Sequence, residues 1–160
     1  MRTICFGIIG LGVIAVKFAD ALARTEGVRL EAVASREQAR SDRFAAEHGA
    51  ARSYGSYEDL LRDPDVDAVY IAVTHNLHAE VARRCIEAGK PVLCEKPFFI
   101  GMSEAEPLVR LARERGILMM EAMWTRCLPA FRQAKAWVDE GRIGEVRLIQ
   151  ASFCFNVMNL

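Results

Sequence analysis

The chain has 160 residues, enough for one domain with a hydrophobic core and too few for two domains of ordinary size. Apolar residues make up 52% and charged residues 26%, a balance typical of soluble globular proteins. Because 21 basic and 21 acidic side chains cancel, bulk charge indicates neither nucleic acid nor an anionic membrane as a partner, and any anion recognition must be local.

The amino-terminal segment predicts neither a signal peptide nor a membrane span. Its apolar run ends at Gly12 and is too short and too glycine-broken for either. The cysteines are odd in number, widely spaced and set among apolar residues, which indicates reduced thiols, mostly buried, rather than a disulfide framework or a metal site. They are Cys5, Cys85, Cys94, Cys127 and Cys154. We therefore expect a cytoplasmic protein.

Strand-like and helix-like patterns alternate from the first residues onward. Predicted strands lie at 3–9, 28–34, 68–73, 91–94 and 117–120, with a short strand or turn at 54–55. Predicted helices lie at 16–24, 35–48, 57–61, 76–87 and 103–115, with Ser35, Ser56, Asn76 and Ser103 as expected amino-terminal caps. Because this alternation is typical of parallel sheets covered on both faces, the sequence predicts an α/β fold with a doubly wound parallel sheet of the Rossmann type.

The alternation changes after residue 122, and we expect a domain boundary there. Residues 123–160 are predicted to begin an incomplete C-terminal α+β domain, with a helix from Pro129 and a long strand over 145–155. A single strand cannot pair with itself, so this strand is expected to belong to a second sheet whose other strands are missing. Apolar side chains occupy both of its faces, which predicts an edge prone to self-association and a possible homo-oligomer.

A glycine turn of the form G-x-G-x-x-A joins the first predicted strand to the first predicted helix, at Gly10, Gly12 and Ala15. Gly10 permits the tight turn, Gly12 lets a pyrophosphate approach backbone N–H groups, and Ala15 keeps the helix close to the strand. The helix amino terminus adds partial positive charge. The pattern predicts that residues 1–122 are an NAD(P)-binding domain, and the alternative is a merely tight turn. The predicted contacts are Gly10, Leu11, Gly12, Val13 and Ile14.

The end of the second predicted strand bears on the choice of cofactor. An NAD site usually places an acidic residue there, whereas this chain has Ala34-Ser35-Arg36, with Arg40 one helical turn later. A hydroxyl donor and two guanidinium groups suit a 2′-phosphate, because arginine makes bidentate charge-assisted bonds to phosphate. The sequence therefore predicts NADP rather than NAD, bound through Ser35, Arg36 and Arg40. The alternative is that both arginines lie on a solvated helix face.

Two further polar segments follow predicted strands. Thr74-His75-Asn76-Leu77-His78 is predicted to line the cofactor through Thr74, Asn76 and His78, and no metal site is predicted because His75 and His78 lack a third ligand nearby. Glu95-Lys96-Pro97 follows the next strand, at the edge where open α/β sheets place their ligands. A surface salt bridge is the alternative there. A lysine whose charged form is disfavoured could exchange a proton while hydride moves to or from a nicotinamide.

These motifs, in this order and spacing, resemble the Gfo/Idh/MocA oxidoreductase family. The segment from Glu121 to Arg126 resembles its dihydrodiol dehydrogenase and glucose–fructose oxidoreductase-like branch, and the resemblance covers essentially the whole chain. It implies that Lys96 is the catalytic acid/base, that Glu95 helps to bind the nicotinamide ribose, and that Trp124 and Arg126 lie near the cofactor.

The resemblance also implies a function. It suggests NADP-dependent hydride transfer to or from a sugar or cyclic diol, with a small-molecule polyol or sugar as substrate. Family members usually carry a complete second domain that supplies substrate contacts, a further catalytic residue and a dimer interface. We therefore interpret the chain as a truncated form of such an enzyme. The alternative is a catalytically silent nucleotide-binding or self-assembling protein that retains only the cofactor half.

Overall fold

The computed structural model describes residues 2–154 of the chain. The strands in this range are β1 (Ile4–Ile9), β2 (Val28–Ala34), β3 (Arg52–Tyr54), β4 (Ala68–Ile71), β5 (Val92–Cys94) and β6 (Met119–Glu121). The helices are α1 (Val13–Leu22), α2 (Gln38–His48), α3 (Tyr57–Arg62), α4 (His78–Glu87), α5 (Met102–Glu114) and α6 (Pro129–Asp139), with short 3-10 helices at His75–Leu77 and Trp124–Cys127. None of the helices within these residues is long and apolar enough to cross a membrane.

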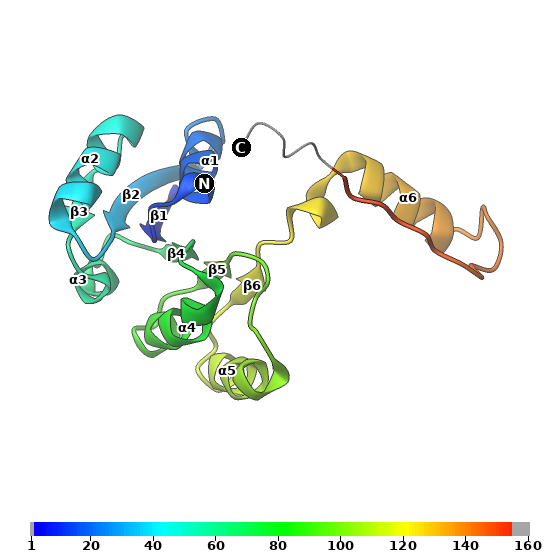
Figure 1. Ribbon diagram of the computed structural model, residues 1–160. Helices are drawn as coiled ribbons and strands as arrows, with labels where there is room; N and C mark the ends of the chain where they lie inside the picture. Colours follow the sequence, from blue (N-terminus) through cyan, green and yellow to red (C-terminus); the bar gives the residue numbers. More distant parts are fainter. Residues whose placement is uncertain (1, 155–160) are drawn as a thin grey trace. The chain divides into compact units, whose positions relative to one another are not determined.

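The strands form one parallel sheet in the order β3-β2-β1-β4-β5-β6. Helices α1 and α2 cover one face, and α3, α4 and α5 cover the other (Figure 1). Neighbouring residues such as Ile8 and Ile9 point to opposite faces, and both are completely buried. This explains why the strands are apolar without alternation, and it confirms the predicted doubly wound α/β sheet.

The chain divides into two compact units, Met1–Ala122 and Met123–Leu160. The first contains the whole sheet. In the second, α6 begins with Pro129 at its first turn, a position that suits a residue without a backbone N–H. The strand predicted over 145–155 is not observed at residues 145–154, and residue 155 lies outside the described residues. That prediction was wrong for the described part, since residues 123–154 contain no other strand that could pair with it.

Several helices begin at residues other than the predicted ones. Helix α2 starts at Gln38 because Ser35 still belongs to the sheet edge, where its N–H donates to the Tyr54 carbonyl at 3.3 Å. Helix α5 starts at Met102, before Ser103, and Asn76 lies within a 3-10 helix instead of capping α4. The Ser56 cap is confirmed, since its hydroxyl accepts the Asp59 N–H at 3.2 Å.

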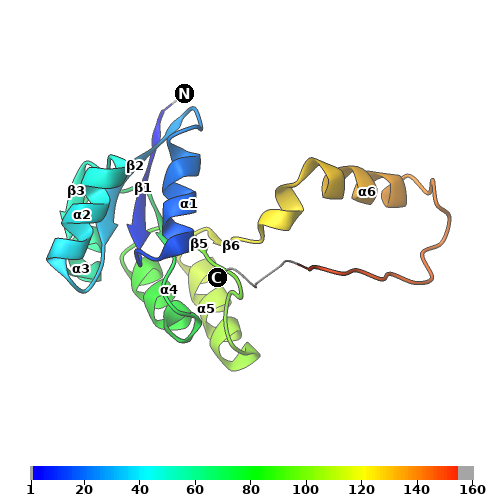
Figure 2. The same ribbon diagram turned by 45° about the horizontal axis from the view of Figure 1, so that its top comes forward.

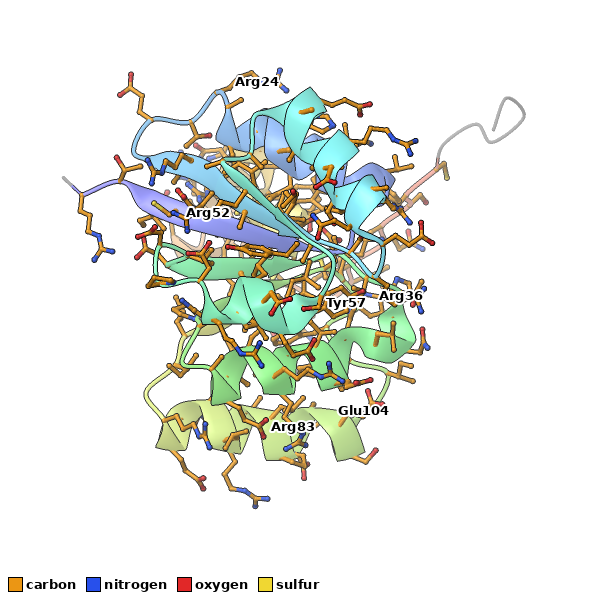
Figure 3. The ribbon with its side chains drawn as sticks, turned by 90° about the vertical axis from the view of Figure 1, so that its left-hand side faces the viewer. Arg24, Arg36, Arg52, Tyr57, Arg83 and Glu104 are labelled. Carbon is orange, nitrogen blue, oxygen red and sulfur yellow. The ribbon has the colours of Figure 1, made fainter. Side chains whose placement is uncertain are left out.

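A cluster of charged side chains links the edge strand β3 to the turn between α3 and β4. Asp63 is 3% exposed and accepts hydrogen bonds from the Tyr54 hydroxyl at 3.0 Å and the Asp65 N–H at 3.0 Å. Arg52, labelled in Figure 3, bonds both Asp63 and Asp65. Burial opposes ionisation of Asp63, but these donors together outweigh burial and lower the pKa of its carboxyl.

The Asp63 carboxylate should make the stability of the protein depend on pH. Because folding lowers its pKa, the contribution is complete above the unfolded value of about 3.9 and is lost as pH falls through the lower folded value. Asp63→Asn should reduce the free energy of unfolding at neutral pH by about 1–3 kcal/mol and flatten its decline in acid. Urea unfolding across the acid range measures both effects. Glu106→Gln, at an exposed position of α5, should leave the curve unchanged.

Candidate functional site

The predicted motifs meet at the carboxyl edge of the sheet. The order of the strands reverses between β1 and β4, so the chain leaves these two neighbours in opposite directions. In open α/β sheets such a switch point opens a crevice for ligands. Figure 2 shows the carboxyl end of β1 turning directly into the amino end of α1, which places the glycine turn at this crevice.

A cavity of about 210 Å³ lies at this edge and brings together residues from four segments of the chain. Its lining includes the predicted residues Gly10, Leu11, Gly12, Ser35, Arg36, Arg40 and Thr74. It also includes residues that the sequence did not single out, namely Glu37, Tyr57, Ala72, Val73 and Leu77. The lining includes apolar and aromatic side chains, Leu77 and Tyr57 among them, together with the charged side chains of Arg36, Glu37 and Arg40.

The glycine turn is held closely against its neighbours. Gly10 has a φ of 90°, and its N–H donates to the Ala34 carbonyl at 3.1 Å. A Cβ on Gly10 would lie 2.7 Å from backbone atoms of Ala72, so a side chain cannot be placed there without moving the backbone just after β4. A Cβ on Gly12 would meet nothing within 4 Å. The space beside Gly12 is thus open to a ligand, whereas Gly10 is needed for the positive φ of the turn and its close packing on the Ala72 backbone.

The first turn of α1 follows Gly12 directly, although its residues Val13 and Ile14 are not part of the cavity lining. Val13 and Ile14 are its first residues, and Val13 is 80% exposed. Their backbone N–H groups precede the first intrahelical hydrogen bonds of the helix, so they are free to bind an anion. The predicted segment from Gly10 to Ile14 therefore offers free backbone donors at Val13 and Ile14, whereas the Gly10 N–H already donates to the Ala34 carbonyl.

Ser35, Arg36 and Arg40 lie at the same end of the sheet but differ in their partners. The Ser35 hydroxyl is buried and lies 2.8 Å from the Glu37 carbonyl and 3.0 Å from the Ser41 hydroxyl. Arg40 donates to the Leu11 carbonyl at 2.8 Å, which joins α2 to the glycine turn. Arg36 is exposed and has no hydrogen-bond or ion-pair partner within residues 2–154. Figure 3 shows Arg36 and Tyr57 at the same end of the molecule. Arg36 is thus the guanidinium that is available to a ligand.

The loop after β5 is anchored at successive residues. The Glu95 N–H donates to the Ile71 carbonyl at 3.0 Å, and one Glu95 oxygen accepts the Lys96 N–H at 3.2 Å. The Phe98 N–H donates to a Glu121 carboxylate oxygen at 2.9 Å. The Lys96 side chain is exposed and has no partner within the described chain. The loop therefore presents one ammonium group from a fixed backbone.

His78 occupies a place different from the predicted one. Its side chain is completely buried, with Nδ1 2.8 Å from the Pro97 carbonyl and Nε2 3.1 Å from the Val73 carbonyl. Because both ring nitrogens face backbone oxygens beneath the surface, His78 joins the loops after β4 and β5 and does not line the cavity. Within the described residues, no group of three side chains is arranged to hold a metal ion.

The remaining predicted residues lie outside the cavity. Asn76 is exposed on the 3-10 helix next to Thr74. Trp124 and Arg126 belong to the second unit, and both are exposed. The Trp124 ring lies edge-on to the Phe153 ring, with the two ring centroids 6.3 Å apart. Their position near a cofactor stays a prediction. Cys94, next to Glu95, is completely buried, and burial raises the pKa of its thiol, so it is not a nucleophile of this site.

Comparisons with known proteins agree with this geometry. Residues 4–123 match the Gfo/Idh/MocA oxidoreductase family, which has an NAD-binding Rossmann fold. The rabbit (Oryctolagus cuniculus) trans-1,2-dihydrobenzene-1,2-diol dehydrogenase is 40% identical over 153 residues, which cover 94% of this chain and 46% of the rabbit protein. The chain thus spans about half the length of the curated relatives it matches.

Solved structures give the same result. An NAD-binding oxidoreductase from Klebsiella pneumoniae is 35% identical with a TM-score of 0.86, over 90% of this chain and 40% of that one. KijD10, a 3-ketoreductase from Actinomadura kijaniata in complex with NADP and TDP-benzene, is 40% identical with a TM-score of 0.83, over 91% of this chain and 45% of that one. With the family match extending over most of the chain, the protein belongs to the Gfo/Idh/MocA oxidoreductase family and carries its NAD(P)-binding Rossmann fold.

Proposed function

We propose that this chain binds NADP(H) and is the cofactor half of an oxidoreductase that transfers hydride to or from a sugar or cyclic diol. The observation that carries the proposal is the cavity in which Arg36, with no partner in the described chain, lies with the open glycine turn. KijD10, a relative of similar fold, was solved with NADP, and the rabbit relative is named for its diol substrate.

Different residues at the cavity would bind different parts of the cofactor. The N–H groups of the glycine turn and the first turn of α1 would bind the pyrophosphate. Arg36 would bind the 2′-phosphate through charge-assisted hydrogen bonds. Arg40 acts through Leu11, whose carbonyl it holds, and the buried Ser35 hydroxyl shapes the turn that presents Arg36.

Glu95 and Lys96 would act at the nicotinamide end of the bound cofactor, where hydride is transferred. A bound nicotinamide supplies the hydride acceptor or donor. As hydride leaves a carbinol carbon, the Lys96 amine would accept the hydroxyl proton, and in the reverse direction its ammonium would return that proton to the carbonyl oxygen. Glu95, whose carboxylate is fixed beside the Lys96 backbone, would bind the ribose hydroxyls. The exposure of Lys96 leaves its amine accessible to a substrate.

Two wider features of the proposal concern location and assembly. We place the protein in the cytoplasm because its cysteines in the described residues are free, as reducing conditions would leave them. Self-association would use the apolar side chains of the second unit, where Leu148 is 75% and Ile149 is 80% exposed. Sedimentation at several concentrations would measure the oligomeric state.

Titration with NADPH and NADH tests the proposed function. Isothermal calorimetry should give a dissociation constant for NADPH at least about 10-fold below that for NADH, the difference expected of a charge-assisted phosphate contact. Turnover is then measured on a panel of sugars and cyclic diols. A preference for NADH would overturn the assignment of Arg36, and no binding of either would overturn the proposal. Tight NADPH binding without turnover would favour a silent nucleotide-binding protein.

A further inference from the structure

Tyr70 is a buried phenol in the middle of the apolar strand β4. It is 2% exposed, and its ring is stacked on Phe18 of α1, with centroids 3.8 Å apart and an interplanar angle of 16°. The packing accounts for the ring but not for the hydroxyl, since a phenylalanine would fill the same volume without a polar group to satisfy. The hydroxyl therefore calls for a separate explanation.

That hydroxyl donates to one Glu95 carboxylate oxygen at 2.5 Å. The other Glu95 oxygen accepts the Lys96 N–H at 3.2 Å. Each oxygen thus has its own donor, one from the core of the sheet and one from the loop, and the carboxylate is held in one orientation. Tyr70 and Leu93 are paired across β4 and β5, so the phenol reaches Glu95 along the same face of the sheet.

The phenol is suited to this task at all ordinary pH values. Burial first, and the neighbouring Glu95 carboxylate second, raise the pKa of Tyr70 well above its usual range. The ring therefore remains neutral and keeps the proton that it donates. A hydrogen bond from a neutral donor to a carboxylate is stronger than one between two neutral groups, so it can set the direction of the Glu95 side chain.

We infer that Tyr70 is a positioning residue, which holds the Glu95 carboxylate beside Lys96 and thereby shapes the nicotinamide-ribose half of the cofactor site. This inference rests on the proposed function for its ligand. The positioning itself does not depend on that function, because the contacts from Tyr70 to Glu95 and from Glu95 to Lys96 involve protein atoms only.

The first test separates the two halves of the cofactor. Tyr70→Phe keeps the ring on Phe18 and removes only the donor. It should weaken NADPH about 3- to 10-fold, as expected for one hydrogen bond to a charged group, while 2′,5′-ADP, which lacks the nicotinamide half, should bind as before. Glu95→Gln should weaken NADPH similarly, and the double variant should lose little more than either single one. An equal loss for NADPH and 2′,5′-ADP, or full additivity, would overturn the inference.

A matched control comes from the edge of the sheet. The Tyr54 hydroxyl also donates to a carboxylate, Asp63, at 3.0 Å, but it lies outside the cavity. Tyr54→Phe should lower the stability of the fold and leave both ligand affinities unchanged. If Tyr54→Phe weakens NADPH selectively as Tyr70→Phe does, the effect is general loosening of the sheet and the inference fails.

A second measurement needs no nucleotide. Tyr70→Phe should shift the ¹H–¹⁵N resonance of the Lys96 amide and increase its hydrogen exchange, while amides at the core of β1 keep their protection. An unchanged Lys96 amide would overturn the inference even if the protein binds NADPH. If the unaltered protein binds neither NADPH nor 2′,5′-ADP, the proposed function fails, and the response of the Lys96 amide still decides whether Tyr70 positions Glu95.

Discussion

Replacing Arg36 with alanine should lower the affinity for NADPH by about 10- to 100-fold and change the affinity for NADH by less than about threefold. The reason is that Arg36 is exposed, lines the cavity and has no partner within the described residues, so all its hydrogen-bonding capacity is available to a 2′-phosphate. NADH has no such phosphate and loses no contact. Calorimetric titration of both cofactors measures the two affinities.

Arg24→Ala is the matched control for the removal of a positive charge. Arg24 lies after α1, and Figure 3 shows it at the top of the view, well away from Arg36. Its guanidinium donates to the Asp20 carbonyl at 2.9 Å. This variant should bind both cofactors as the unaltered protein does. An equal loss of NADPH and NADH affinity in Arg36→Ala would show that the arginine supports the cavity rather than the phosphate.

Alanine at the two glycines of the turn should affect different properties, the folding stability at Gly10 and the affinity for NADPH at Gly12. Gly10→Ala places a Cβ 2.7 Å from the Ala72 backbone and forces a positive φ on alanine, so it should cost at least about 2 kcal/mol of folding stability. Gly12→Ala has open space and a φ of −87°, so the fold should keep its stability. Its methyl group would occupy the place of the pyrophosphate and should weaken NADPH by at least about 10-fold.

Urea unfolding and NADPH titration of both variants measure this contrast. Stability lost in Gly10→Ala and affinity lost in stable Gly12→Ala would assign the first glycine to the backbone and the second to the ligand. Should Gly12→Ala bind NADPH normally, the pyrophosphate does not approach this turn, and the cofactor must be sought elsewhere at the sheet edge.

The order of elements could be predicted because it depends on local pattern. Apolar runs such as the one around Ile8 and Ile9 are long and bounded by glycine, and both residues are completely buried. Helix starts were less predictable, since Ser35 resembles a cap in sequence but is retained at the sheet edge by the Tyr54 carbonyl. The strand expected over 145–155 had the right alternation, but a strand also needs a partner, which local sequence cannot supply.

The site was predictable where its chemistry lies within one short segment. The glycine turn and Arg36 line a common cavity because both directly follow neighbouring strands. The sequence predicts that His78 lines the cofactor, yet its ring lies between the Pro97 and Val73 carbonyls, and Pro97 is 19 residues away along the chain. Tyr70 was overlooked because its partner is 25 residues away. A signal existed, since a tyrosine in a strand buried on both faces needs a partner for its hydroxyl.

The anchoring of the loop after β5 has a consequence for how fast a ligand can be bound. Strand β4 holds Glu95, helix α4 holds Pro97 and strand β6 holds Phe98, so the loop is ordered by folding alone. A ligand that binds at Lys96 should therefore have little conformational entropy of this backbone left to remove. Association at this end of the site should therefore be governed by diffusion and charge rather than by a slow closure of the loop.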